Sequence, residues 1–245
     1  MTSLVALGEL QGREDLLRQL SYPVGDLSHA LEAAGALDSL GVEAIALDER
    51  GGLRLLGKGF RNIVLEGWMP GARVAVKIRR SDYAVRDAER EAAMLGAANS
   101  LGVGPKLIGW RGSVIVMELV PGPDLSSWLT GRGYRPDEAR DTLLSLLTHC
   151  RALDRGGLDH RELSDARRHV IKTEQGPVII DFGSARFSRR PKNLTSISSY
   201  LSAPRMVSVR EYIGLGTPGR ETLRRYKETL GEGEFRELLA GMGLL

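Results

Sequence analysis

Residues 158–185, LDHRELSDARRHVIKTEQGPVIIDFGSA, hold the densest group of chemically active side chains in the chain. The stretch contains five carboxylates and two histidines, and its run of β-branched residues ends at Asp181. Asp181 closes the apolar segment PVIID, where a carboxylate would otherwise be poorly placed, and an oxygen ligand suits Mg²⁺. The stretch therefore predicts a metal-binding carboxylate at the end of a short strand.

The composition is that of a soluble globular protein. The chain has 245 residues, enough for one large domain or two small lobes. Hydrophobic residues make up 42% and charged residues 27%. Cys150 is the only cysteine, which excludes an intrachain disulfide and favours a reducing compartment. No apolar run approaches the roughly 20 residues that span a bilayer, and the N-terminus does not resemble a secretory signal. We therefore expect a cytoplasmic protein without a membrane partner.

Strand patterns dominate the first half of the chain and helix patterns the second. Helices are expected at residues 13–20 and 27–40, then strands to residue 79, a helix over 81–102 and two further strands. Pro121-Gly122-Pro123 interrupts the pattern. A long helix is expected over 137–154, and Thr217-Pro218 is expected to open a later one. This order predicts an α+β fold with a helical extension at 1–50, a β-rich lobe at 51–121 and an α-rich lobe at 122–245.

A lysine within an apolar strand marks a second candidate site. Lys77 lies in VAVKI, and burying an ammonium is costly unless it is paired. We expect Glu91 rather than Glu89 as its partner, because Met94 and Leu95 follow Glu91 at helical spacing. Upstream, Gly57 and Gly59 lie between two strands, where glycines let backbone N–H groups approach phosphate oxygens. Asn62 holds the place of a third glycine, and asparagine tolerates a positive φ better than most residues do.

These motifs together resemble those of protein kinases. Gly-x-Gly-x-x-x-x-Val, Val-Ala-Val-Lys, a helix glutamate, VMELV before a hinge, His-x-Glu-Leu and Asp-Phe-Gly occur in the order seen in that family. The chain is most similar to the atypical, RIO-like predicted serine/threonine kinases of archaea, through VKIRR, LGVGPKLIG, LDHREL, RHVI, IIDFGSA and NLTSISSYL. The resemblance covers residues 50–205 and implies a two-lobed kinase-like fold with a reduced α-helical C-lobe.

The resemblance implies a site for ATP and Mg²⁺. Lys77 would contact the α- and β-phosphates and Glu91 would orient it, while Asp181 would bind Mg²⁺. Met117 would line the adenine pocket, and backbone groups of Glu118 and Val120 would meet the adenine edge. The residues implied in nucleotide binding are Gly57, Gly59, Val64, Ala75, Lys77, Glu91, Met117, Glu118 and Val120.

The chain departs from the kinase pattern in the catalytic loop. Glu162 stands where kinases have an aspartate; it keeps the carboxylate, which mainly positions the acceptor hydroxyl, on a longer side chain. Arg167 stands where a metal-binding asparagine is usual, and it cannot ligate Mg²⁺. In a longer loop His169 takes that place, although imidazole suits Mg²⁺ less than oxygen does. As acceptor carboxylate we rank Glu162 first, Asp159 second and Asp165 third, and we expect His160 to brace the loop.

Three functions remain open. The first is ATP-dependent phosphoryl transfer to Ser or Thr of a protein, including the chain itself, by Lys77, Glu162 or Asp159. The second is an ATP-binding module that engages a ribosomal or other protein complex. The third is a small-molecule phosphotransferase. No nucleic-acid-binding motif is evident, but the cations of residues 186–192 indicate an acidic or phosphate-rich partner.

Overall fold

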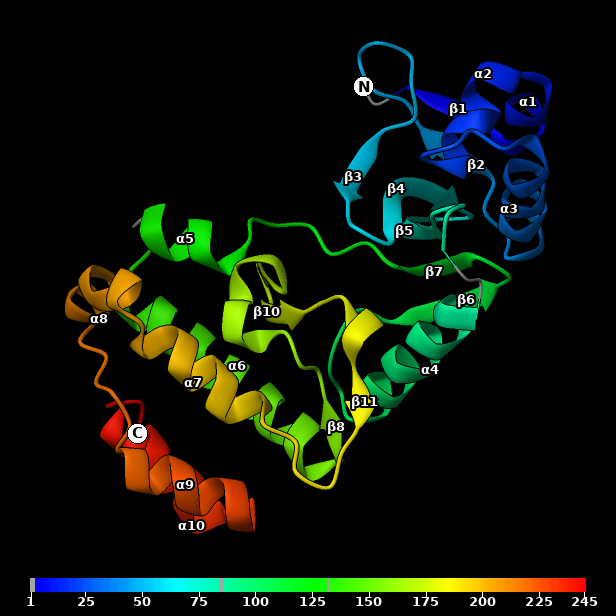
Figure 1. Cartoon of the computed structure of the whole chain (residues 1–245). Coiled ribbons are helices and arrows are strands. Elements are labelled where there is room, and N and C mark those ends of the chain that lie inside the picture. Colours follow the sequence, from blue (N-terminus) through cyan, green and yellow to red (C-terminus); the bar gives the residue numbers. More distant parts are fainter. Residues whose placement is uncertain (1–2, 84–85, 132) are drawn as a thin grey trace. The chain divides into compact units, whose positions relative to one another are not determined.

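The computed structural model of the chain describes residues 3–83, 86–131 and 133–245. It has an α+β fold (Figure 1) and divides into two compact units. The first, called the sheet unit, comprises Met1–Gly96 and Pro105–Leu119. The second, called the helical unit, comprises Ala97–Gly104 and Val120–Leu245.

An antiparallel sheet forms the centre of the sheet unit. Its strands lie in the order β1-β2-β4-β5-β7-β6, and β3 also pairs with β4. β4 and β5 are joined by a tight turn in which Gly71 has a φ of 74°, a conformation that glycine adopts without strain. The strands are β1 (Leu4–Ala6), β2 (Ala44–Ala46), β3 (Leu55–Lys58), β4 (Asn62–Met69), β5 (Ala72–Arg79), β6 (Leu107–Arg111) and β7 (Val114–Glu118).

The two faces of this sheet are covered by different helices, because successive side chains of a strand point to opposite faces. One face packs against α1 (Leu7–Gly12), α2 (Glu14–Leu17) and α3 (Leu27–Ser39). The other packs against α4 (Arg86–Ser100). The buried strand residues on the α1–α3 face are Val5, Ile45, Ile63, Leu65, Val74, Val76, Ile78, Val114 and Val116.

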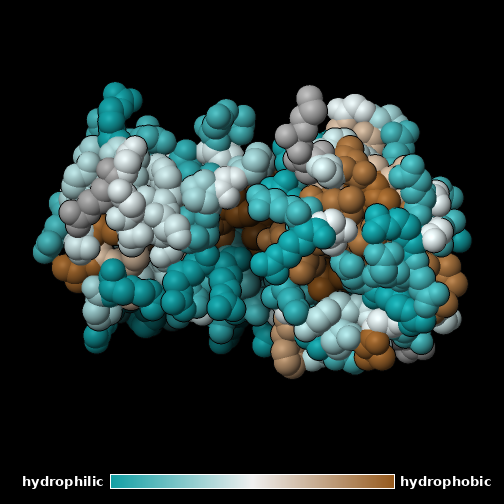
Figure 2. Space-filling model, turned by 90° about the horizontal axis from the view of Figure 1, so that it is seen from above, coloured by the Kyte–Doolittle hydropathy of each residue, from teal (hydrophilic) through white to brown (hydrophobic). Residues whose placement is uncertain are grey.

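The N-terminal range therefore shares its core with the sheet. β1 and β2 extend the sheet, with β2 paired to β4. Residues 1–50, expected as an extension, thus lie in the same compact unit as the strands. Hydrophobic side chains remain exposed in this unit, among them Val24, Phe60 and Trp110. The face seen in Figure 2 shows brown hydrophobic residues among teal hydrophilic ones.

Helices make up most of the helical unit. α6 (Pro136–Arg155) is its longest helix among the described residues and buries the apolar side predicted from the sequence, including Leu143, Leu147 and Cys150. α7 (Asn193–Ser202) runs beside α6, and α9 (Arg220–Thr229) lies beside α10 (Glu232–Gly241) (Figure 1). The unit also contains α5 (Leu125–Gly131) and α8 (Val207–Ile213). Its short 3₁₀ turns are η2 (Leu163–Arg168), η3 (Phe182–Ser184) and η4 (Pro204–Met206). A further 3₁₀ turn, η1 (Arg18–Ser21), lies in the sheet unit.

The helical unit also contains two small antiparallel sheets of two strands each. β8 (Leu158–Asp159) pairs with β11 (Arg186–Phe187), and β9 (Val170–Thr173) pairs with β10 (Gly176–Ile179). The helix expected to open at Thr217-Pro218 instead begins at Arg220, with Gly219 as its N-cap residue. Among the described residues, no helix is both long enough and apolar enough to cross a membrane.

Candidate functional site

A buried ion pair links β5 to α4. The ammonium of Lys77 donates a hydrogen bond to Oε1 of Glu91, and the side chains are 7% and 4% exposed. Lys77 faces α4 because it alternates with Val76 and Ile78, which pack on the other face of the sheet. Glu89 is exposed. The sequence-based choice of Glu91 as the partner of Lys77 is confirmed.

This ion pair is incomplete as a hydrogen-bonded unit. Oε2 of Glu91 is buried, and no hydrogen-bond partner for it is found among the described residues. Removing two charges from water costs several kcal/mol per ion, so a buried pair is weak evidence for stability. The pair therefore calls for an explanation other than folding.

The predicted nucleotide-binding residues of the sheet unit lie in one region of the sheet. Lys77 is directly opposite Val64, which is directly opposite Gly57 on β3. Ala75 is opposite Met117 in the same way. Residues directly opposed in an antiparallel pair point to the same face, and positions 75 and 77 share a face because they are two apart. Val64, Ala75, Lys77 and Met117 are therefore on the face that packs against α4.

The glycine segment is a tight turn between β3 and β4. The N–H of Gly59 donates to the carbonyl oxygen of Asn62 at 2.9 Å. Neither Gly57 nor Gly59 has a positive φ, and added Cβ atoms would come no closer than 4.0 Å and 3.5 Å to their neighbours. Asn62 does not adopt a positive φ, and its side chain accepts a hydrogen bond from Arg79 at 3.1 Å. Backbone conformation and packing thus leave the glycines unexplained.

The end of β7 holds the residues expected at the adenine edge. The N–H of Glu118 donates to the carbonyl oxygen of Lys106 at 2.9 Å, and its carboxylate accepts from the N–H of Lys106 at 3.1 Å. An adenine contact from the backbone of Glu118 would therefore have to come from its carbonyl oxygen. Val120 belongs to the helical unit.

In the helical unit, His160 connects the segment before Glu162 with the segment that contains Asp181. Its Nε2 lies 2.9 Å from the carbonyl oxygen of Ile180, and its ring meets the ring of Phe182 edge to face at 5.0 Å. Burial lowers the pKa of His160 to about 4, so the ring is neutral at pH 7 and Nε2–H is the donor. The predicted bracing role of His160 agrees with these contacts.

Two residues of these motifs have left-handed backbone conformations. Arg161 has a φ of 75° and Asp181 a φ of 66°. Such conformations cost on the order of 1–3 kcal/mol in a residue other than glycine, and they concentrate at functional sites. Oδ1 of Asp181 caps η3, where it accepts from the N–H of Gly183 at 3.4 Å, and the residue is exposed. Strain therefore coincides with the loop of the predicted acceptor carboxylate and with the predicted metal ligand.

The candidate acceptor carboxylates differ in their surroundings. Glu162 is half-buried, just before η2. Asp159 is 3% exposed, and its Oδ1 has no hydrogen-bond partner among the described residues. Asp165 accepts two hydrogen bonds from Arg167, at 2.7 and 2.5 Å, which lower its pKa to about 2. Asp165 is thus occupied by Arg167, which leaves Glu162 and Asp159 as the better candidates.

Few groups of the helical unit are suited to bind a metal ion. The described residues contain no group of three or more His, Cys, Asp or Glu side chains arranged to hold one. Mg²⁺ at phosphate-binding sites is commonly held by one or two carboxylates together with phosphate oxygens and water, so the Asp181 carboxylate fits that role. The Nδ1 of His169 is buried without a partner among the described residues, and its ring meets that of His160 at 5.4 Å. As a nitrogen donor it fits Mg²⁺ poorly.

A buried hydrogen-bond network behind this loop was not predicted from the sequence. The carboxylate of Asp154 accepts from the backbone and side-chain nitrogens of Asn193, from the N–H of Leu194 and from the hydroxyl of Tyr226, at 2.8–3.1 Å. The Asn193 side chain also donates to the carbonyl oxygen of Leu158 and accepts from the N–H of His160. Asn193 thus fixes the segment that leads to Glu162. The signal in the sequence is Asp154 on the apolar side of α6.

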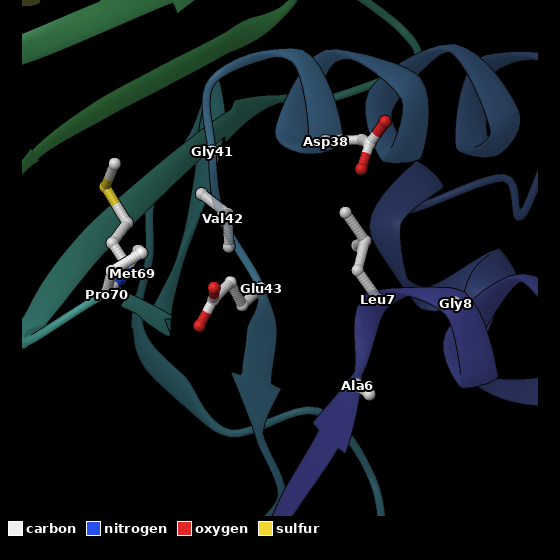
Figure 3. Close-up of a pocket in the computed structure, with 9 residues that line it drawn as sticks. All are labelled: Ala6, Leu7, Gly8, Asp38, Gly41, Val42, Glu43, Met69 and Pro70. Atoms are coloured by element: carbon white, nitrogen blue, oxygen red, sulfur yellow. The ribbon is translucent and has the colours of Figure 1, made fainter.

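A hollow of about 510 Å³ opens elsewhere in the sheet unit, at the end of α3 and the start of β2 (Figure 3). The carboxylates of Asp38 and Glu43 and the side chain of Leu7 border it. None of the predicted site residues lines it, and neither carboxylate is buried. The hollow is therefore separate from the predicted site residues. No protein-family model matches the chain, and no curated protein shows a significant match to it.

Proposed function

We propose that the chain is an ATP-dependent, kinase-like phosphotransferase of the atypical protein kinase type, which phosphorylates Ser or Thr of a protein. The observation that supports this most is the buried Lys77–Glu91 pair on the α4 face of the sheet. Because a buried ion pair is weak evidence for stability, we infer that the ammonium of Lys77 serves a ligand. A triphosphate is such a ligand, since its charge offsets that of Lys77.

The surrounding residues fit the same ligand. Gly57 and Gly59 leave space for phosphate oxygens, and neither backbone conformation nor packing gives another reason for glycine there. Glu91 would hold the ammonium of Lys77 in place. Asp181 would bind the Mg²⁺ that neutralises charge on the phosphates.

Glu162 would hold the acceptor. Its carboxylate would accept a hydrogen bond from the Ser or Thr hydroxyl and take the proton as the hydroxyl oxygen bonds to the γ-phosphorus of ATP. The bond between that phosphorus and the oxygen bridging to the β-phosphate would break, and ADP would leave with the electron pair. The longer side chain of glutamate is compatible with this role because positioning dominates catalysis of phosphoryl transfer. Asp159 is the second candidate, and its buried position makes it less accessible to a hydroxyl.

Phosphotransfer from labelled ATP tests the proposal. We expect the wild-type chain with Mg²⁺ to transfer label to itself or to a generic protein acceptor. Lys77→Ala, Asp181→Ala and Glu162→Gln should each reduce the rate by about 100-fold or more, as for groups that act on the transition state. Lys227→Ala, at an exposed lysine of α9, is the matched control. Equal transfer by all five proteins would exclude these residues from the mechanism.

One observation favours a second function, an ATP-binding module with little or no transfer. Arg167, where kinases have a metal-binding asparagine, is paired with Asp165 and not directed to a metal. Calorimetry would distinguish the two functions. Tight binding of ATP without transfer of phosphate would favour the module, whereas transfer that depends on Glu162 would exclude it.

A further inference from the structure

A strongly basic surface lies next to the loop that contains Glu162. Residues 186–192 contain four cations and no carboxylate. These side chains are exposed, as is that of Arg155, which ends α6 two residues before Gly157. Together they are called the basic strip: Arg155, Arg186, Arg189, Arg190 and Lys192.

The backbone that carries the basic strip is held in place. β11 pairs with β8, so that Arg186 lies opposite Asp159. The N–H of Ser188 donates to the carbonyl oxygen of Gly157 at 2.8 Å, and Pro191 is buried. A partner would therefore meet cations on an ordered backbone, which lowers the entropic cost of binding.

Among the described residues of the helical unit, no salt bridge to a member of the basic strip is found. The salt bridges found among the described residues of this unit involve other cations, namely Arg151, Arg167, Lys172, Arg224 and Arg225. A cluster of cations without carboxylate partners repels itself and attracts an anionic partner. Four of the five members are arginines, whose guanidinium groups bind carboxylates and phosphates through paired hydrogen bonds.

We propose that the basic strip binds an acidic segment of the protein acceptor next to the Ser or Thr to be phosphorylated, an inference that rests on the proposed phosphotransfer. Arg186 is opposite Asp159, three residues before Glu162, so the strip begins beside the acceptor loop. Four cations within seven residues suit a short run of Asp or Glu. Single-stranded nucleic acid uses several aromatic side chains for stacking, whereas Phe187 is the one aromatic residue of 186–192.

Binding and transfer are measured together on the full chain. The probes are two fluorescent peptides that contain one Ser, flanked by Glu in one and by Gln in the other, and an oligouridylate of equal charge to the first. Fluorescence anisotropy should show the Glu peptide binding at least about tenfold more tightly than the Gln peptide, with an affinity that falls as salt rises. The double variant Arg189→Glu/Arg190→Glu should lose this preference. Arg220→Glu/Arg236→Glu, with the same charge change at exposed arginines of α9 and α10, should keep it.

The outcomes separate this inference from the proposed function. Equal binding of the two peptides, or tighter binding of the oligouridylate that displaces the Glu peptide, would overturn the acidic-segment assignment. Equal transfer of phosphate to both peptides would overturn it as well while leaving phosphotransfer standing. Selective binding of the Glu peptide, unchanged in Lys77→Ala but without transfer by any form, would retain the basic strip and reject the phosphotransferase.

Discussion

The two units bury charge in different ways. In the sheet unit, Lys77 and Glu91 form an ion pair whose second carboxylate oxygen has no partner among the described residues. In the helical unit, Asp154 is buried among four hydrogen-bond donors, and no salt bridge to it is found among the described residues. A carboxylate whose oxygens all accept hydrogen bonds serves the fold, whereas a buried ion pair contributes little to stability.

Removing one charge from the sheet unit should have the largest effect on stability. Glu91→Ala leaves the buried ammonium of Lys77 without its carboxylate, and breaking a buried pair in this way costs about 3–5 kcal/mol. Urea unfolding, with Glu89→Ala on the same helix as control, measures the loss. A change no greater than that of the control would mean that Lys77 is hydrated and not buried in solution.

Replacing both charges sharpens the comparison. Lys77→Met/Glu91→Leu removes the two ions together and keeps side chains of similar size. Because apolar replacement of a buried pair is often neutral or stabilising, the double variant should recover most of the stability lost in Glu91→Ala. Recovery would show that this pair is dispensable for folding, and failure to recover would give it a structural role.

In the helical unit, Asp154→Ala removes the acceptor for four donors. Because these donors stay buried without a partner, the free energy of unfolding should fall by about 2–4 kcal/mol, measured by urea unfolding. Asp141→Ala, at an exposed position of the same helix, should change stability little. The variant should also weaken phosphotransfer, because Asn193 would no longer be held against Leu158 and His160. A stable Asp154→Ala protein would contradict the structural role of the network.

The network also predicts a pH dependence that the ion pair does not explain. Burial raises the pKa of Asp154 to about 6, while the unfolded chain titrates near 4. The contribution of Asp154 to the free energy of unfolding is therefore fully present below pH 4 and is lost as pH rises from 4 to 6. The unfolding free energy of the wild type minus that of Asp154→Asn should fall by about 3 kcal/mol over this interval. A flat or rising difference would contradict the assignment.

The smallest effect is expected at the exposed pair of Arg167 and Asp165. Both side chains are about half exposed, at 55% and 44%. Because water screens such a pair, Arg167→Ala should leave the midpoint of urea unfolding unchanged within error. A measurable loss of stability would show that this pair organises η2.

The sequence predicts the elements and the ion pair because both depend on local periodicity. Helical spacing was sufficient to select Glu91 over Glu89, and both ends of α6 were predicted within one residue. The start of α9 was not predicted, since the helix begins at Arg220 with Gly219 as its N-cap residue and not at the capping signal of Thr217-Pro218. Local chemistry alone does not determine whether such a signal is used.

The Asp154 network lies beyond sequence reasoning for a different reason. Asp154 and Asn193 are 39 positions apart, and Tyr226 lies on a third helix. No periodic pattern relates them, because tertiary packing alone brings them together. The left-handed conformations of Arg161 and Asp181 are equally nonlocal, since surrounding structure must impose them.

Calorimetric titration with ATP and Mg²⁺ tests the central claim, that the Lys77–Glu91 pair binds a nucleotide phosphate. The wild type is compared with Lys77→Met/Glu91→Leu, after unfolding measurements have shown that the double variant is folded. We expect the folded double variant to bind ATP at least about tenfold more weakly, because it lacks the cation that meets the phosphates. ATP affinity equal to that of the wild type would contradict the claim.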